Sequence, residues 1–206
     1  MKVSRPLWIE GAFLAPHQFQ QQARWEALTN QCIAQLSLTH PWGVLNARFD
    51  GEALRVNRLN AQHLAVRLQD GTLIDSDRAD SLPAAVDLQR AIPADCNQVT
   101  VLLALPLEHA NGGNCQTGTQ ASERPLRYQQ EWVSVQVVFG NEQESIAVER
   151  YALSRRFDID NTVEYFTCPL VRLQRDGQNG WQIDNSFIPP LLAFGGSELL
   201  QDQLSL

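Results

Sequence analysis

From residue 42 onward, short runs of alternating apolar and polar residues are separated by turn residues. A period of two places successive side chains on opposite faces of a half-buried β-strand. Residues 44–49, 64–68 and 145–153 follow this pattern. Residues 99–105 are continuously apolar, as expected for a strand that is buried on both faces. We therefore predict a mainly β fold, a β-sandwich or a barrel, and not a succession of βαβ units.

Glycine-containing turn pairs connect several of these runs. Three hairpins are expected: 64–68 with 73–74 around Asp70-Gly71, 132–139 with 145–153 around Gly140-Asn141, and 164–173 with 181–184 around Asp176-Gly177. Asp50-Gly51 is expected to form a further turn, after which residues 54–59 alternate less cleanly.

Residues 1–16 are predicted to be an extended arm, because Pro6, Gly11 and Pro16 interrupt any regular structure. The arm is nevertheless rich in large apolar side chains: Leu7, Trp8, Ile9, Phe13 and Leu14. Exposed apolar residues in such number mark a contact surface. We expect the arm to dock on its own domain, on a sister chain or on a partner.

Residues 17–40 are predicted to be one amphipathic helix, which is clearest from His17 to Leu38. Pro16 stands in the first turn, where proline is tolerated, and His40-Pro41 ends the helix. Its apolar stripe has spacings of three and four residues: Trp25, Leu28, Cys32 and Leu36, with Phe19 and Ile33 beside it. A helix with one apolar face should lie across something else.

Residues 42–192 are predicted to form the β-sandwich domain. Within them, 110–125 is polar and rich in small residues, which favours a mobile loop or an exposed excursion. Residues 197–206 are expected to begin a helix capped by Ser197, the truncated start of a helical middle domain in a longer parent protein.

The charge and the apolar runs exclude several classes of function. The formal net charge is −7, which argues against broad binding to nucleic acid or to anionic lipid. No signal peptide is evident, and the longest apolar stretch, 101–106, is too short for a membrane span. We predict a cytoplasmic protein with no direct membrane insertion. Cys96 and Cys115 could pair in an oxidising compartment, but free thiols are the expectation here.

No motif for catalysis, a cofactor or a metal stands out. The four histidines lack a second ligand at metal-binding spacing. His63 could pair with Asp50 or Asp70 in space. Asp75, Asp77 and Asp80 suggest a solvated turn with Arg78 compensating, since a calcium loop would need a closing glutamate. We therefore predict no catalytic residue, no cofactor and no metal.

The five tryptophans are spread along the chain, and most are expected to anchor the core. Trp8 and Trp25 are the two that we weigh as contact residues, since tryptophan is favoured at interface hot spots as well as in cores.

Residues 5–22, RPLWIEGAFLAPHQFQQQ, carry the block W-x-E-G-x-F-L-x-P-x-x-F-Q-Q-Q. This block resembles the opening of the TssK family (also VasE or ImpJ), the baseplate subunit of the type VI secretion system. Residues 70–75, DGTLID, and 187–192, FIPPLL, are also similar to that family's pattern, so the resemblance spans essentially the whole chain. The 110–125 segment matches no family motif.

The resemblance implies a β-sandwich similar to the shoulder domain of siphophage receptor-binding proteins, with one N-terminal helix. It also implies a structural adaptor that forms a homotrimer, holds the wedge subunits TssF and TssG, and reaches the membrane-complex subunits TssL and TssM through a C-terminal region absent here. Neither catalysis nor a cofactor is implied.

Three functional hypotheses follow. The first is the assembly adaptor, with interface anchors at Trp8, Phe13, Leu14, Phe19 and Trp25; the alternative is that Phe13, Leu14 and Phe19 only cap their own sandwich. The second is a carbohydrate- or ligand-binding β-sandwich, whose loose candidate group is Asp158, Asp160, Asn161 and Tyr165. The third, ranked last, is a hydrolase that uses Asp158 and Asp160, although a capped turn explains this pair better.

Overall fold

The structure is a computed structural model of the 206-residue chain, and it describes residues 2–118, 122–136, 139–178, 180–197 and 200. The helices are α1 (Pro16–Ser37), α2 (Gly51–Arg55) and α3 (Leu88–Ala91), with a 3-10 turn, η1, at Phe194–Gly196. The strands are β1 (Gly43–Phe49), β2 (Arg58–Leu59), β3 (Ala61–Arg67), β4 (Leu73–Asp75), β5 (Val86–Asp87), β6 (Gln98–Pro106), β7 (Cys115–Gln116), β8 (Tyr128–Gln136), β9 (Gln143–Tyr151), β10 (Ser154–Phe157), β11 (Tyr165–Arg175) and β12 (Trp181–Ile183).

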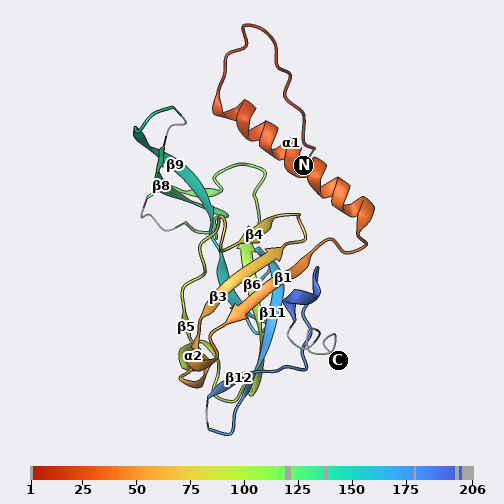
Figure 1. The fold of residues 1–206 in the computed structure, drawn as a ribbon, viewed down its shortest axis with the longest axis vertical. Helices are drawn as coiled ribbons and strands as arrows, with labels where there is room; N and C mark the ends of the chain where they lie inside the picture. Colours follow the sequence, from red (N-terminus) through yellow and green to blue (C-terminus); the bar gives the residue numbers. More distant parts are fainter. Residues whose placement is uncertain (1, 119–121, 137–138, 179, 198–199, 201–206) are drawn as a thin grey trace.

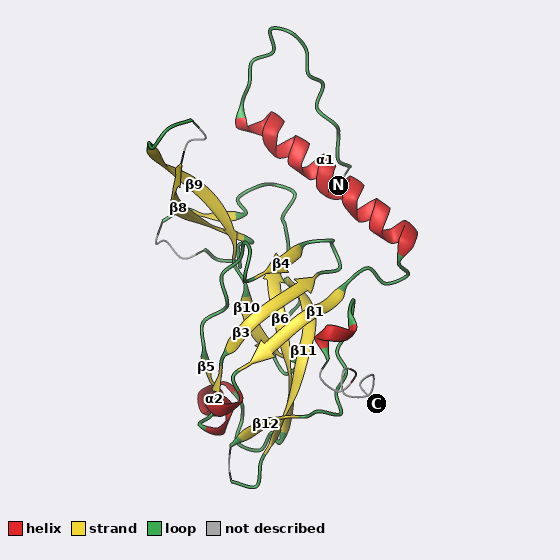
Figure 2. Cartoon of the chain, viewed as in Figure 1, coloured by secondary structure: helices red, strands yellow, loops and turns green. Residues whose placement is uncertain are grey.

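Two antiparallel sheets share one apolar core, which confirms the mainly β prediction. One sheet has the order β1-β3-β4 and the other β10-β6-β11-β12, and they lie over one another in the body of the molecule (Figure 2). Fully buried side chains from both sheets meet between them: Val44, Leu64, Val66 and Ile74 with Val101, Leu103, Leu170 and Leu173. The continuously apolar β6 is buried along nearly its whole length, as predicted for 99–105.

All three expected hairpins are present, formed by β3 with β4, β8 with β9, and β11 with β12. The prediction of a turn and a strand after residue 50 is wrong. Asp50 instead caps α2, and its Oδ1 accepts hydrogen bonds from the backbone N–H groups of Glu52 and Ala53, both at 3.1 Å. Asn57 then takes a left-handed conformation, φ 60°, and only the two residues of β2 follow as strand.

Two segments depart from the sandwich. The β8–β9 hairpin belongs to a separate sheet, β7-β8-β9, and projects from the same end of the sandwich as the one that α1 lies over (Figure 1). Its partner β7 comes from the predicted loop at 110–125, of which residues 119–121 lie outside the described part. The predicted helix at 197–206 also lies almost entirely outside the described residues.

Candidate functional site: the N-terminal arm and helix α1

Residues 2–15 have no regular secondary structure; they begin beside the middle of α1, loop away from it and come back to its N-terminal end (Figure 1). Two contacts hold the arm to the helix. The side-chain amide of Gln21 donates to the backbone oxygen of Ser4 at 2.8 Å, and the rings of Trp8 and Phe19 lie 6.1 Å apart between their centroids. The arm therefore lies against its own helix, not against the sandwich.

Gln18 fixes the junction between the arm and the helix. Its Oε1 accepts from the backbone N–H of Ala15 at 2.9 Å, and its Nε2 donates to the backbone oxygen of Phe13 at 2.9 Å. A side chain that bonds back to an otherwise unsatisfied backbone N–H stabilises a helix start, and Pro16 supplies a pre-set φ there. The helix ends at Ser37 because Leu38 is extended, three residues before the predicted limit of residue 40.

The apolar stripe of α1 is not covered within a single chain. None of the 22 residues of the helix is buried, and Leu28, Cys32 and Leu36 of the predicted stripe are all exposed, whereas Trp25 is half-buried. Phe13 is 87% exposed and Phe19 59% exposed, and Leu14 is exposed as well. The alternative in which these three residues cap their own sandwich is therefore wrong.

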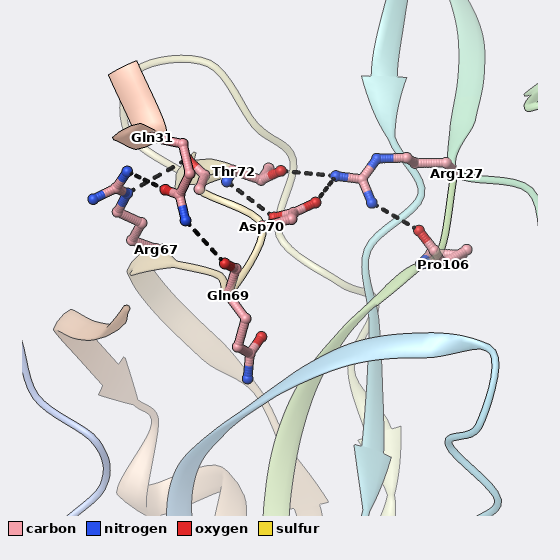
Figure 3. Close-up of polar contacts among 8 residues, drawn as sticks. Gln31, Arg67, Gln69, Asp70, Thr72, Pro106 and Arg127 are labelled. Atoms are coloured by element: carbon pink, nitrogen blue, oxygen red, sulfur yellow. Dashed lines mark hydrogen bonds and ion pairs between the residues drawn. The ribbon is translucent and has the colours of Figure 1, made fainter. Parts of the chain in front are cut away.

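A small polar cluster attaches α1 to the β3–β4 turn. We call it the polar seat, and it consists of Gln31, Arg67 and Gln69. The side-chain amide of Gln31 donates to the backbone oxygen of Gln69 at 3.1 Å and accepts from the Arg67 guanidinium at 2.6 Å (Figure 3). Gly71, with φ +90°, leaves the space that the Gln31 side chain occupies. The turn is tied to the second sheet by the Gln69 amide, which donates to the backbone oxygen of Thr167 at 2.8 Å.

Arg127 holds this turn in place from the other side (Figure 3). Its buried guanidinium bonds Asp70 Oδ2 at 2.6 Å, Thr72 Oγ1 at 2.7 Å and the backbone oxygen of Pro106 at 3.0 Å. Burial alone would lower the pKa of Arg127, but the negative charge of Asp70, together with Tyr128, outweighs it and the pKa lies above its ordinary value. The cation is thus permanently charged and rigidly placed.

A second, weaker contact joins α1 to the body. The Arg24 guanidinium lies 2.8 Å from Glu108 Oε1, and both side chains are about 40% exposed. An exposed ion pair of this kind contributes roughly 0.2–1 kcal/mol. The polar seat around Gln31 is the stronger attachment, because its groups are partly buried.

The sequence singled out the Asp70-Gly71 turn, but not what the turn does. Gln31 lies on the polar side of the predicted helix, and Arg127 follows an unstructured segment, so neither spacing nor periodicity marked them. Their roles come from contacts between residues 36 to 57 positions apart.

Comparison with known families and structures identifies the chain. The family model described as "Bacterial Type VI secretion, VC_A0110, EvfL, ImpJ, VasE" matches residues 18–206. The chain belongs to the TssK (VasE/ImpJ) family. Comparison with curated proteins gave no match.

Solved structures of TssK-containing assemblies agree with this assignment. The chain is 48% identical to a chain of a type VI secretion TssK-TssF-TssG baseplate subcomplex, with a TM-score of 0.92, covering 99% of this chain and 67% of that one. It is 42% identical to a chain of TssK from EAEC in complex with a nanobody, with a TM-score of 0.77, covering 91% of this chain and 60% of that one. A crystal structure of TssK at 23% identity and a TM-score of 0.84 shows the same fold. The chain is therefore a type VI secretion baseplate component, as its opening motif implied.

The residues considered as a ligand-binding group use their side chains in hydrogen bonds within and beside a turn: Asp158, Asp160, Asn161 and Tyr165. Asp158 and Asp160 lie in a turn after β10, where Asp158 Oδ1 accepts from the backbone N–H of Thr100 at 3.1 Å and Asp160 Oδ2 from that of Phe157 at 2.8 Å. Asn161 likewise accepts from the backbone of Val163, and the Tyr165 hydroxyl accepts from Arg156. The capped-turn interpretation of Asp158 and Asp160 is confirmed.

The other polar candidates also have structural roles. His63 lies 3.0 Å from Asp77, not beside Asp50 or Asp70 as suggested. Arg78 lies 3.4 Å from Asp75, which confirms the compensated turn. Within the described residues no cluster of three or more metal-ligating side chains is found, and no helix is long and apolar enough to cross a membrane. All four cysteines are free thiols.

Proposed function

We propose that this chain is the wedge-holding part of a baseplate adaptor: the arm and α1 bind TssF and TssG through their exposed apolar side chains. One observation carries the proposal. A 22-residue helix without a single buried residue is held out from the body by a dedicated polar seat, together with an apolar arm. The role is structural, not catalytic.

Physical considerations favour a partner for this surface. An isolated helix gains little stability from its backbone alone and normally depends on burying an apolar face. Trp8 and Trp25 with Phe13, Leu14 and Phe19 offer the aromatic and aliphatic anchors that dominate interface energies. A solved relative comes from a TssK-TssF-TssG baseplate subcomplex, which supports the identity of the partner.

We further propose that the protein acts as a homotrimer on the cytoplasmic side and reaches TssL and TssM through regions outside these 206 residues. The chain spans 60% of the TssK chain from EAEC and 43% of a chain in another baseplate complex, which supports the assignment of the TssL and TssM contacts to regions beyond it. The net charge of −7 agrees with an absence of nucleic-acid binding.

The test is capture of purified TssF–TssG by the double variant Trp8→Ala plus Phe13→Ala. We expect at least about a 30-fold loss of affinity, which corresponds to the roughly 2 kcal/mol of a single hot-spot aromatic. The matched control, Ile159→Ala plus Val163→Ala, removes exposed apolar side chains from the β10–β11 turn and should bind normally. Undiminished capture by a folded Trp8→Ala plus Phe13→Ala protein would remove the arm from the interface.

A further inference from the structure

The β8–β9 hairpin exposes apolar side chains on both of its faces. Trp132, on one face, is 65% exposed, and Val135 and Ile146, on the other, are exposed too. Among the described strands only the two residues of β7 join it. Most of its length is therefore two-stranded, an arrangement that is only marginally stable by itself in water, and its exposed apolar side chains favour a covering segment. The prediction that most tryptophans anchor the core is wrong for Trp132.

The outer edge of β9 is the open side of this small sheet. The order β7-β8-β9 leaves β9 without a paired strand on that side among the described residues, although Arg150, near the end of β9, donates to the backbone oxygen of Ala79 at 2.8 Å. Unpaired backbone N–H and C=O groups on such an edge are a template for an added strand. Glu144, Ile146 and Val148 share one face of β9, since alternate residues point the same way.

The arm presents a matching open side. Its even positions contact its own helix, through the Ser4 oxygen bonded by Gln21 and the Trp8 ring against Phe19. Of its odd positions, Leu7 is 81% exposed and Ile9 62% exposed, whereas Val3 is half-buried. A turn then ends the extended stretch, where Gly11 has φ +77° and the Ala12 N–H bonds the Ile9 oxygen at 3.2 Å.

We propose that the outer edge of β9 is the docking site for residues 3–9 of the arm of a second copy of this chain, added as a parallel strand. In this register Arg5 lies beside Glu144, Leu7 beside Ile146, and Ile9 beside Val148. Arg5, Leu7 and Ile9 direct their backbone groups toward β9. Pro6, which lacks an N–H, faces away from the sheet, where proline is tolerated on an edge strand.

The charges of the two segments favour the arm as the strand that binds at the β9 edge. Residues 128–151 carry four glutamates and one arginine, a net charge of −3, whereas residues 2–9 carry Lys2 and Arg5 and no carboxylate. A basic, apolar, extended segment thus faces an acidic, apolar strand edge, a complementarity that steers encounter and fixes register.

We assign the arm to a second protomer because each arm already contacts its own α1 through Ser4 and Trp8, which leaves its opposite side for another chain. Each chain then offers one arm and one hairpin, a head-to-tail contact that closes as a ring when the rotation is threefold. This inference rests on the proposed homotrimer.

The experiment uses two differently tagged copies of the intact protein with Cys32, Cys96 and Cys115 changed to serine. One copy carries Leu7→Cys, the other Ile146→Cys, and a short bis-maleimide is added after co-expression. We expect a cross-linked pair of differently tagged chains. The matched control replaces Ile146→Cys by Val163→Cys, an exposed position in the β10–β11 turn, and should give no such pair.

Charge reversal adds a second measurement. Arg5→Glu should lower the cross-linking yield up to about 5-fold, the upper range for an exposed ion pair, and Glu144→Arg in the other copy should restore it. Absence of a cross-linked pair of differently tagged chains, or cross-linking of the Ile146→Cys variant to TssF or TssG instead, would overturn the inference.

The oligomeric mass separates the two proposals. A trimer by light scattering without the cross-link refutes the arm exchange and leaves the homotrimer intact. A monomer that still captures TssF–TssG refutes both the arm exchange and the homotrimer, and leaves the wedge-binding role standing.

Discussion

Gly71→Ala tests whether the polar seat positions α1. Gly71 has φ +90°, and a Cβ placed there would meet the Oε1 of Gln31 and approach its Cδ to 3.0 Å. A left-handed conformation costs a non-glycine residue roughly 1–2 kcal/mol. The Gln31 side chain would also swing away and lose its bonds to Arg67 and to the Gln69 oxygen. With one charged and one neutral partner, that loss is about 2–3 kcal/mol.

The two costs have separate readouts. The backbone strain acts on the free energy of unfolding, measured by urea denaturation. Loss of the seat acts on the attachment of α1, measured by amide hydrogen exchange over residues 16–37, where a loss of 2 kcal/mol raises the population of the detached helix about 30-fold.

Gly112→Ala is the matched control. Gly112 has φ +81°, but a Cβ there would meet nothing within 4 Å. It should carry a similar backbone cost while leaving exchange in α1 unchanged. In a Gln31→Ala background, Gly71→Ala should add no further exchange in α1, because the clashing side chain is gone. Equal protection of α1 from hydrogen exchange in Gly71→Ala and in the wild type would refute the claim that the polar seat positions α1.

Three further outcomes follow from the same contacts. Arg127→Met should lower the free energy of unfolding by about 3 kcal/mol in urea denaturation, because it leaves Asp70 and the Pro106 oxygen without their buried partner, and a wild-type value would contradict the role given to Arg127. Gly43→Ala should destabilise by more than about 2 kcal/mol in thermal unfolding, since its Cβ would lie 2.6 Å from the backbone oxygen of Pro190 at φ +137°; a cost no larger than that of Gly112→Ala would show that the chain yields there. Cys168 should resist maleimide at pH 8 while Cys32 reacts, because burial raises the pKa of the Cys168 thiol to about 12 and keeps it protonated; rapid labelling of Cys168 in the folded protein would contradict that burial.

Local sequence signals predicted the elements that local physics determines. Gly140-Asn141 and Asp176-Gly177 stand between apolar runs, and the hairpins formed there because turn chemistry and a period of two act over a few residues. Asp50-Gly51 carries the same pair but became a helix cap. The Asp50 carboxylate bonds the next backbone N–H groups equally well in either setting, and the burial of Leu54 favours the helix.

The site could be predicted only as a set of apolar residues. Periodicity showed that α1 has an apolar stripe, but the same sequence pattern is expected whether the stripe is buried within the chain or left exposed. The seat depends on contacts between Gln31 and Arg67 and between Asp70 and Arg127, whose pairing follows from the packed sheets. Long-range polar contacts of this kind leave no periodic signal.

The division between buried polar contacts and exposed apolar appendages explains how such a chain can serve assembly. Arg155 illustrates the first part: burial lowers its pKa to about 10, yet it remains charged at neutral pH and bonds the backbone oxygens of Leu59 and Pro83 at 2.7 Å each. Its loss would weaken the body. Trp8, in contrast, is half exposed, and its one ring contact among the described residues is with Phe19, so truncating it costs little folding energy while removing a proposed binding anchor. Stability and assembly are thus encoded in different residues, which is why variants of the arm can separate the two.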